Sequence, residues 1–90
     1  MIIFLYILNK GVIKHMERLL KLLNEIRPDL DFTKESRLVT DSVIDSFDII
    51  TIVTEINEVF DISINAADLE PENLNSAEAM WELITRLEKE

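Results

Sequence analysis

The feature that most constrains this 90-residue chain is the spacing of its apolar residues, which recur every three or four positions in several segments. Such spacing places the apolar side chains on one face of a helix. The chain has one glycine and two prolines, so it has few of the residues that tight turns between β-strands need. A single all-α domain is therefore predicted, because a chain this short has no room for a second core.

The first predicted helix runs from about Met16 to Ile26, and Pro28 stops it two residues later. A long connection from Asp29 to Ile44 follows, and its apolar residues are expected to hold it against the core. The apolar stripe of this helix consists of Leu19, Leu22, Leu23 and Ile26, with Leu20 beside it. The apolar residues of the connection are Leu30, Phe32, Leu38, Val39, Val43 and Ile44.

The second predicted helix starts at Asp45 or Ser46 and ends near Phe60. Many of its residues are β-branched and would also suit a strand, but their apolar spacing fits the helical period better than a period of two. Asp45 is a good N-cap, and Asp48 three residues later can complete a capping box. The side chains expected in the core from this helix and beyond are Phe47, Ile50, Ile56, Ile64 and Met80.

A short third helix is predicted from Asn65 to about Leu69. Asn65 would be its cap, with Asp68 three residues on. Pro71 is expected to end it, since proline does not continue a helix. The segment from Glu70 onward is then a connection to the last helix.

The last helix is predicted to begin at Asn75 or Ser76, with Asn75 and Glu78 as a further capping pair. Its apolar stripe consists of Met80, Leu83, Ile84 and Leu87, and Trp81 lies beside it, partly exposed. Three longer helices and one short third helix predict a four-helix bundle.

Residues 1–15 differ from the rest of the chain. Their apolar run from Ile2 to Leu8 is shorter than the roughly 20 residues that span a bilayer, and it lacks the basic start and cleavage site of a secretory signal. We interpret 1–15 as an N-terminal extension that either docks on something or precedes a natural start at Met16; the second interpretation is favoured. The functional domain is then 16–90, without stable membrane insertion.

The chain has a formal net charge of −9, and its acids are unevenly distributed. Between Leu38 and Thr85 there is no lysine or arginine. The acids of that segment are Asp41, Asp45, Asp48, Glu55, Glu58, Asp61, Asp68, Glu70, Glu72, Glu78 and Glu82. Such a surface repels nucleic acid and attracts proteins with basic patches, although acids also serve solubility alone.

Few residues are suited to catalysis. The chain has no cysteine and one histidine, His15, which excludes a Cys–His pair and leaves only His15 for a serine triad. His15 is expected to be a solvated side chain. Without cysteine or an EF-hand pattern no metal site is expected, and a reducing, cytoplasmic setting fits. We therefore expect a protein that is acted upon and is not an enzyme.

Ser46 is the residue most open to a functional interpretation. An Asp-Ser pair before an apolar run is most often just a helix cap. A hydroxyl at the start of a helix is nevertheless exposed, and a phosphate attached there meets free backbone N–H groups and the positive end of the helix dipole. Ser46 is therefore well placed to carry a phosphodiester.

Three features near Ser46 are typical of one family: Asp45-Ser46-Phe47 at the start of the second helix, Phe60 at its end, and Ile62-Ser63-Ile64-Asn65 after it. On these residues, and on its helix order, the chain from about Met16 onward resembles the acyl carrier and peptidyl carrier protein family. Phe47 stands where that family usually has leucine, and Asn65 where proline is common. The fold implied is an acyl-carrier-like four-helix bundle.

The resemblance implies a covalent 4'-phosphopantetheine arm, which a phosphopantetheinyl transferase would move from coenzyme A to Ser46. The thiol of the arm would carry an acyl or aminoacyl group as a thioester. Asp45 and Phe47 would flank the attachment site, with Asp45 helping to position the serine. A loading ligase and downstream transferases would be the further partners. The residues expected to meet their basic patches and surfaces are Asp48, Glu55, Glu58 and Ile64.

The cargo stays open between a fatty acid and the aminoacyl, D-alanyl-like, polyketide or peptide cargo of a specialised pathway. The main alternative function is an unmodified acidic helical module that docks to a basic partner protein. A hydrolase that uses Ser46 is a weaker alternative, because no base lies near it in sequence. The carrier itself is expected to be a monomer.

Overall fold

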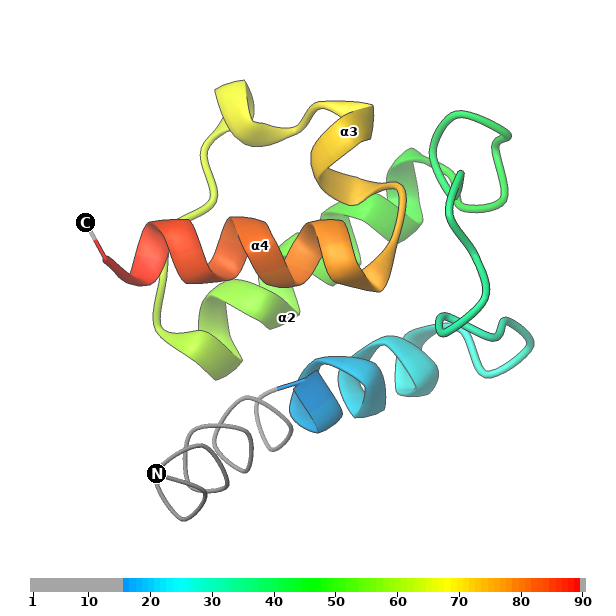
Figure 1. Ribbon diagram of the computed structural model, residues 1–90, viewed down its shortest axis with the longest axis horizontal. Helices are drawn as coiled ribbons and strands as arrows, with labels where there is room; N and C mark the ends of the chain where they lie inside the picture. The colour runs from blue at the N-terminus through cyan, green and yellow to red at the C-terminus, as the bar shows by residue number, and fades with distance from the viewer. Residues whose placement is uncertain (1–15, 90) are drawn as a thin grey trace, which may run out of the picture.

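The computed structural model describes residues 16–89 of the chain, and every regular element in that range is helical (Figure 1). The elements are a helical segment over 16–26, α2 (Ser46–Phe60), the 3-10 turn η1 (Ala66–Asp68), α3 (Pro71–Leu74) and α4 (Ala77–Glu88). The predicted all-α class is thus confirmed for this range. The predicted extension 1–15, with His15, lies outside the described residues.

The core takes side chains from each of the longer helices and from the connection between the first two. The largest fully buried side chains are Leu19, Leu23, Leu38, Ile52, Ile56, Met80, Leu83 and Ile84. Burying such a side chain stabilises the fold by roughly 1.5–3 kcal/mol relative to leaving it in water. None of the described helices is long and apolar enough to cross a membrane.

The connection between the first helical segment and α2 is held against the core, as predicted. Phe32, Leu38 and Ile44 are buried in it. Its three other apolar residues, Leu30, Val39 and Val43, are partly buried and pack against the same core. The connection therefore fixes the place at which α2 starts.

Asn75, which lies between α3 and α4, binds the backbone of this connection. Its backbone carbonyl accepts a hydrogen bond from the Leu38 N–H at 3.0 Å, and its side-chain Oδ1 accepts from the N–H groups of Val39 (2.9 Å) and Thr40 (3.0 Å). The predicted capping pair of Asn75 with Glu78 is wrong, because the Asn75 side chain is used in these long-range bonds.

Ser76 caps α4 in place of Asn75. Its hydroxyl accepts a hydrogen bond from the Ala79 N–H at 3.0 Å, which satisfies one of the backbone donors that a helix start leaves free. Of the two predicted start positions, Ser76 is the one that the structure uses.

Pro71 begins a helix where the sequence predicted that it would end one. The short helix expected over 65–69 is the 3-10 turn η1, in which an Asp68 carboxylate oxygen accepts from the Asn65 N–H at 3.0 Å. Pro71 is then the first residue of α3. Proline is well tolerated there, since the N–H it lacks would have no partner in the first turn.

The core-facing side of α2 differs from the predicted one. Ile56 is buried as expected, but it lies in a stripe with Ile52 and Phe60. Phe47 and Ile50, both predicted to be core residues, are 76% and 64% exposed. The prediction failed because α2 has apolar residues on both faces, so helical spacing alone does not select the buried one. Of the other predicted core residues, Met80 is buried and Ile64 is half-buried.

The orientation of α2 can be tested with one substitution made at two positions. Ile56→Val removes a buried methylene and is expected to cost about 1 kcal/mol of unfolding free energy. Ile50→Val makes the same change at an exposed position and is expected to cost less than about 0.5 kcal/mol. Urea denaturation followed by circular dichroism measures both. Equal losses would contradict the observed orientation.

Candidate functional site

Ser46 is the first residue of α2, and its side chain is exposed. Within the described range its hydroxyl forms no hydrogen bond. Asp45, the residue before it, has an extended backbone and is the N-cap of the helix. A free hydroxyl therefore lies at the tip of a 15-residue helix, as the sequence predicted.

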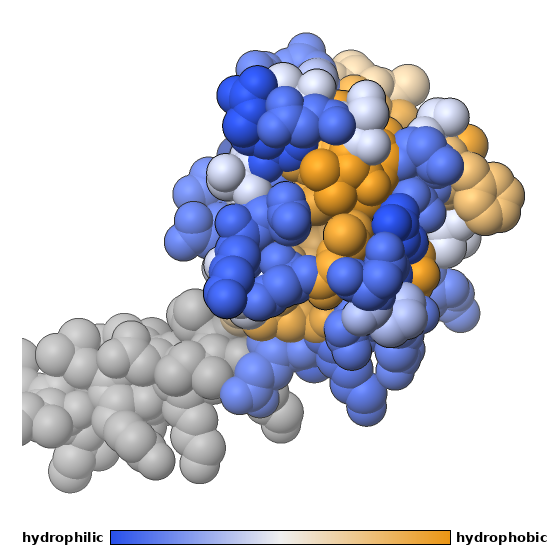
Figure 2. All heavy atoms as spheres, turned by 90° about the vertical axis from the view of Figure 1, so that its right-hand side faces the viewer, coloured by the Kyte–Doolittle hydropathy of each residue, from blue (hydrophilic) through white to orange (hydrophobic). Residues whose placement is uncertain are grey.

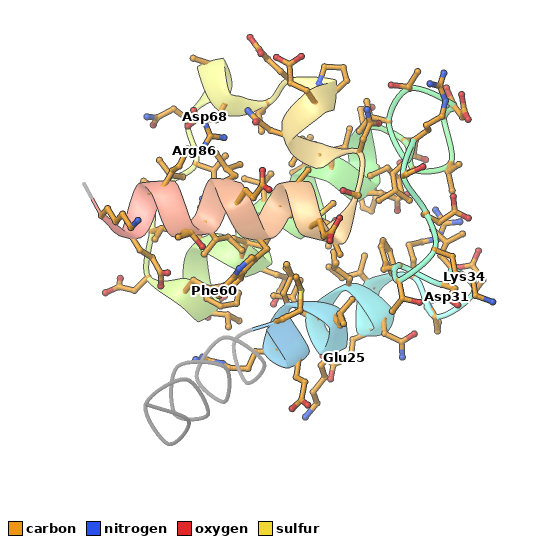
Figure 3. The ribbon with its side chains drawn as sticks, viewed as in Figure 1. Glu25, Asp31, Lys34, Phe60, Asp68 and Arg86 are labelled. Atoms are coloured by element: carbon orange, nitrogen blue, oxygen red, sulfur yellow. The ribbon has the colours of Figure 1, made fainter. Side chains whose placement is uncertain are left out.

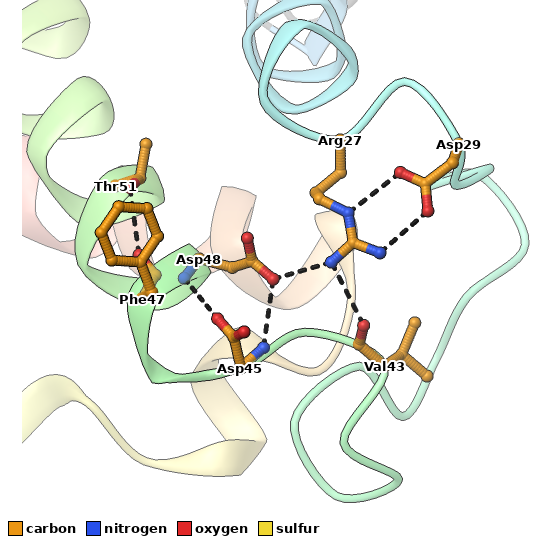
Figure 4. A network of polar contacts seen from close by, with 7 residues as sticks. All are labelled: Arg27, Asp29, Val43, Asp45, Phe47, Asp48 and Thr51. Carbon is orange, nitrogen blue, oxygen red and sulfur yellow. Dashed lines mark hydrogen bonds and ion pairs between the residues drawn. The ribbon is translucent and has the colours of Figure 1, made fainter.

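Asp45 and Asp48 form the predicted capping box at this tip (Figure 4). The Asp48 N–H donates to Asp45 Oδ1 at 2.8 Å, and the Asp45 N–H donates to Asp48 Oδ2 at 3.2 Å. Each carboxylate thus satisfies a backbone donor that the helix start would otherwise leave free. Negative charge is also favourable at this end of the helix dipole.

Arg27 is the residue at this site that the sequence analysis did not single out. Its Nη1 donates to Asp48 Oδ2 at 2.7 Å and to the Val43 carbonyl at 3.4 Å, and its Nε and Nη2 bind Asp29 at 2.9 and 2.8 Å (Figure 4). The hydrogen bonds to Arg27 hold the pKa of Asp29 below its ordinary value, and the two carboxylates raise the pKa of the guanidinium. One cation therefore joins the end of the first helical segment to the start of α2.

Phe47 and Ile50 expose apolar surface directly beside Ser46. Both are large side chains that are mostly in water. The hydroxyls of Thr51 and Thr54 donate to the backbone carbonyls of Phe47 and Ile50 at 3.0 and 2.8 Å. Their donor hydrogens are therefore used within the helix and are not available to a partner on this side. Exposed large apolar side chains such as these are typical of a surface that meets another molecule.

The predicted docking residues do not form one cluster. Glu55 and Glu58 are exposed on α2. The side chain of Asp48 is only 14% exposed and is paired with Arg27. Ile64 is half-buried, and its backbone N–H donates to Asn57 Oδ1 at 2.9 Å. Glu55 and Glu58 are thus the acids in this set that are open to a partner.

The other end of α2 is held by a different arginine. Arg18 donates from Nη2 to the Val59 carbonyl at 3.2 Å, and its guanidinium carbon lies 5.4 Å from the centre of the Phe60 ring. Phe60 is the last residue of the helix and points into the bundle (Figure 3). One arginine thus contacts each end of α2: Arg18 comes from the first helical segment, and Arg27 directly follows it.

Hydrophilic side chains cover most of the face on which the connection lies, with apolar surface showing between them (Figure 2). Among the charged residues on other parts of the molecule, Lys34 pairs with Asp31, and Arg86 donates to Asn73 Oδ1 at 3.0 Å (Figure 3). No group of three or more acidic or histidine side chains within 16–89 is arranged to hold a metal ion.

A hollow of about 350 Å³ lies away from Ser46. Its lining comes from the first helical segment, the connection and the start of α4, with no residue of α2. The residues that line it are Met16, Leu20, Phe32, Thr33, Lys34, Glu35, Ser36, Ser76, Ala77 and Glu78.

Comparisons with protein-family models, with curated proteins and with solved structures found no match to this chain.

The ion pair of Arg27 with Asp29 makes a prediction about pH. A carboxylate whose pKa is lower in the folded than in the unfolded state adds stability above its unfolded pKa, and that stability is lost as the pH falls through the folded pKa. Asp29→Asn should therefore lower the unfolding free energy near neutral pH, and its difference from the wild type should disappear as the pH falls through the lowered pKa of Asp29. Urea denaturation at several pH values measures the difference.

Glu25→Gln is the matched control, because Glu25 is an exposed carboxylate on the first helical segment and points away from the bundle (Figure 3). It should cost little stability at any pH. A loss for Asp29→Asn that is independent of pH would contradict the electrostatic explanation.

Proposed function

We propose that this chain is a carrier protein that holds an acyl or aminoacyl group as a thioester on a 4'-phosphopantetheine arm attached to Ser46. The observation that carries the proposal is the exposed, unbonded hydroxyl of Ser46 as the first residue of α2. A phosphodiester on this oxygen would lie at the positive end of the helix dipole. The Asp45-Ser46-Phe47 motif, which resembles that of the carrier family, adds support.

The attachment would be a phosphoryl transfer from coenzyme A. The Ser46 oxygen forms a bond to the phosphorus that bears the pantetheine, and the bond between the two phosphates of coenzyme A breaks. Adenosine 3',5'-bisphosphate leaves, and the hydroxyl proton passes to a base of the transferase. The chain supplies only the nucleophilic oxygen, so it needs no catalytic residue of its own.

The fold that goes with this function is an acyl-carrier-like four-helix bundle. In this proposal the helical segment 16–26, α2 and α4 are the three longer helices. The short elements η1 and α3 together take the place of the third helix. The chain would work as a cytoplasmic monomer.

The partners would be a phosphopantetheinyl transferase, a loading ligase and downstream transferases. Phe47 and Ile50 would supply the apolar contact next to the arm, and Glu55 and Glu58 would face basic patches on the partner. Exposed charges add little affinity each but steer the encounter. Weak contacts with fast release suit a protein that visits several enzymes in turn.

A second candidate is an unmodified acidic helical module that docks to a basic partner. The observation in its favour is that Phe47 and Ile50 offer a contact surface whether or not Ser46 bears an arm. The two candidates differ in one property, which is the covalent state of Ser46.

Incubation with coenzyme A and a promiscuous phosphopantetheinyl transferase is expected to add the mass of one phosphopantetheine, as measured by intact mass spectrometry. Ser46→Ala should abolish the gain, whereas Ser63→Ala, which removes another exposed serine, should keep it. Folded wild type of unchanged mass would favour the unmodified module.

Removal of the exposed ring should weaken docking without unfolding the protein. Because truncating an aromatic contact at an interface costs about 1–2 kcal/mol, Phe47→Ala should lower kcat/KM for arm transfer by roughly tenfold. Val59→Ala removes apolar surface that is 36% exposed at the other end of α2 and should leave kcat/KM unchanged. Equal rates for both variants would place docking on a different surface.

A further inference from the structure

Arg27 and the tip of α2 are joined through a single carboxylate oxygen. Asp48 Oδ2 accepts from Arg27 Nη1 at 2.7 Å and also from the Asp45 N–H at 3.2 Å (Figure 4). Asp48 in turn donates its own N–H to Asp45 Oδ1 at 2.8 Å. The guanidinium therefore holds the acid that closes the capping box around Ser46.

Arg27 reaches this tip from a part of the chain 21 residues away in sequence. Its Nη1 also donates to the Val43 carbonyl, three residues before Ser46, at 3.4 Å. Two planar contacts with Asp29, at 2.9 and 2.8 Å, fix the plane of the guanidinium itself. A group anchored on one side can restrain what it holds on the other, and the rigid fork of arginine suits this better than a flexible ammonium.

The ion pair with Asp48 is better shielded from water than the other pairs of the described residues. Its side chains are 27% and 14% exposed, compared with 62% and 53% for the pair of Arg37 with Asp41. Solvent screens a half-buried pair less than an exposed one, and its geometry is correspondingly better defined.

We infer that Arg27 is the positioning residue for arm attachment: by holding Asp48 it fixes the first turn of α2, and with it the Ser46 hydroxyl, in the geometry that a transferase meets. This inference rests on the proposed carrier function. Arg27 touches neither the arm nor the reacting oxygen. Its effect passes through Asp48 and Asp45, and through its contact with the Val43 carbonyl.

Loss of the Arg27 charge and loss of its positioning role are expected to change different kinetic constants, KM and kcat. Removing a cation makes the tip of α2 more negative, so charge alone would strengthen binding to a basic transferase and lower KM. Loss of positioning instead lowers kcat, because the hydroxyl is less often in line with the phosphorus. A purely structural role would change stability and leave both constants of the folded protein unaltered.

The test compares Arg27→Gln, Arg27→Lys and Arg18→Gln in arm transfer from coenzyme A, with kcat and KM measured separately. Arg18→Gln is the matched control, because Arg18 ties the helical segment that precedes Arg27 to the opposite end of α2. Arg27→Gln is expected to lose about tenfold in kcat with KM equal or lower. Arg27→Lys keeps the charge but not the fork, so its kcat should also fall severalfold, whereas Arg18→Gln should keep wild-type kcat.

Amide hydrogen exchange gives a readout that does not depend on any transferase. Protection of the Asp48 and Ile49 amides in the first turn of α2 should fall about tenfold in Arg27→Gln, beyond any fall at Ile56 in the middle of the helix. Arg18→Gln should leave the first turn protected. The Lys variant keeps the test valid if Arg27→Gln does not fold.

The outcomes separate this inference from the proposed function. If wild type is never modified, the carrier function fails, and the positioning role fails with it. If wild type is modified and both Arg27 variants keep its kcat, the carrier function stands and Arg27 is only structural. A lower KM with unchanged kcat in Arg27→Gln would likewise overturn positioning and leave a charge effect.

Discussion

The burial of one stripe of α2 is the constraint on which the other features depend. Ile52, Ile56 and Phe60 face the shared core, and this fixes how the helix is turned about its own axis. Once these residues are inside, Phe47 and Ile50 have to face water. The apolar surface beside Ser46 is thus a consequence of core packing. Its exposure to water is unfavourable, and contact with another protein would remove that exposure.

The start of α2 is fixed by two kinds of interaction that share one carboxylate. The capping box of Asp45 and Asp48 is local, because its two residues lie three positions apart in the sequence. The pair of Asp48 with Arg27 is long-range and joins the helix to the segment before the connection. Because both use Asp48 Oδ2, the acid expected to meet partners is largely occupied within the chain. An acid at the start of a helix can therefore hold the local geometry instead of binding a partner.

The connection of residues 29–44 does more than join two helices. Its buried residues Phe32, Leu38 and Ile44 pack into the core. Asn75, between α3 and α4, forms hydrogen bonds with its backbone. The connection has no helix or strand of its own, and these contacts hold it, and with it the N-terminal end of α2, in place. The exposed Ser46 hydroxyl thus lies on a helix whose tip is restrained by Arg27, by the connection and, through the connection, by Asn75.

The sequence by itself determined the helical class, the cap of α2 at Asp45 and the exposed Ser46, because capping and helix stops depend on residues within one turn of each other. It did not determine which face of α2 is buried, because both faces are apolar. It also missed the start of α3 at Pro71, the long-range hydrogen bonds of Asn75, and the ion pair of Arg27 with Asp48. Those were decided by the tertiary structure, because each depends on partners that lie far away in the sequence and meet only when the core forms.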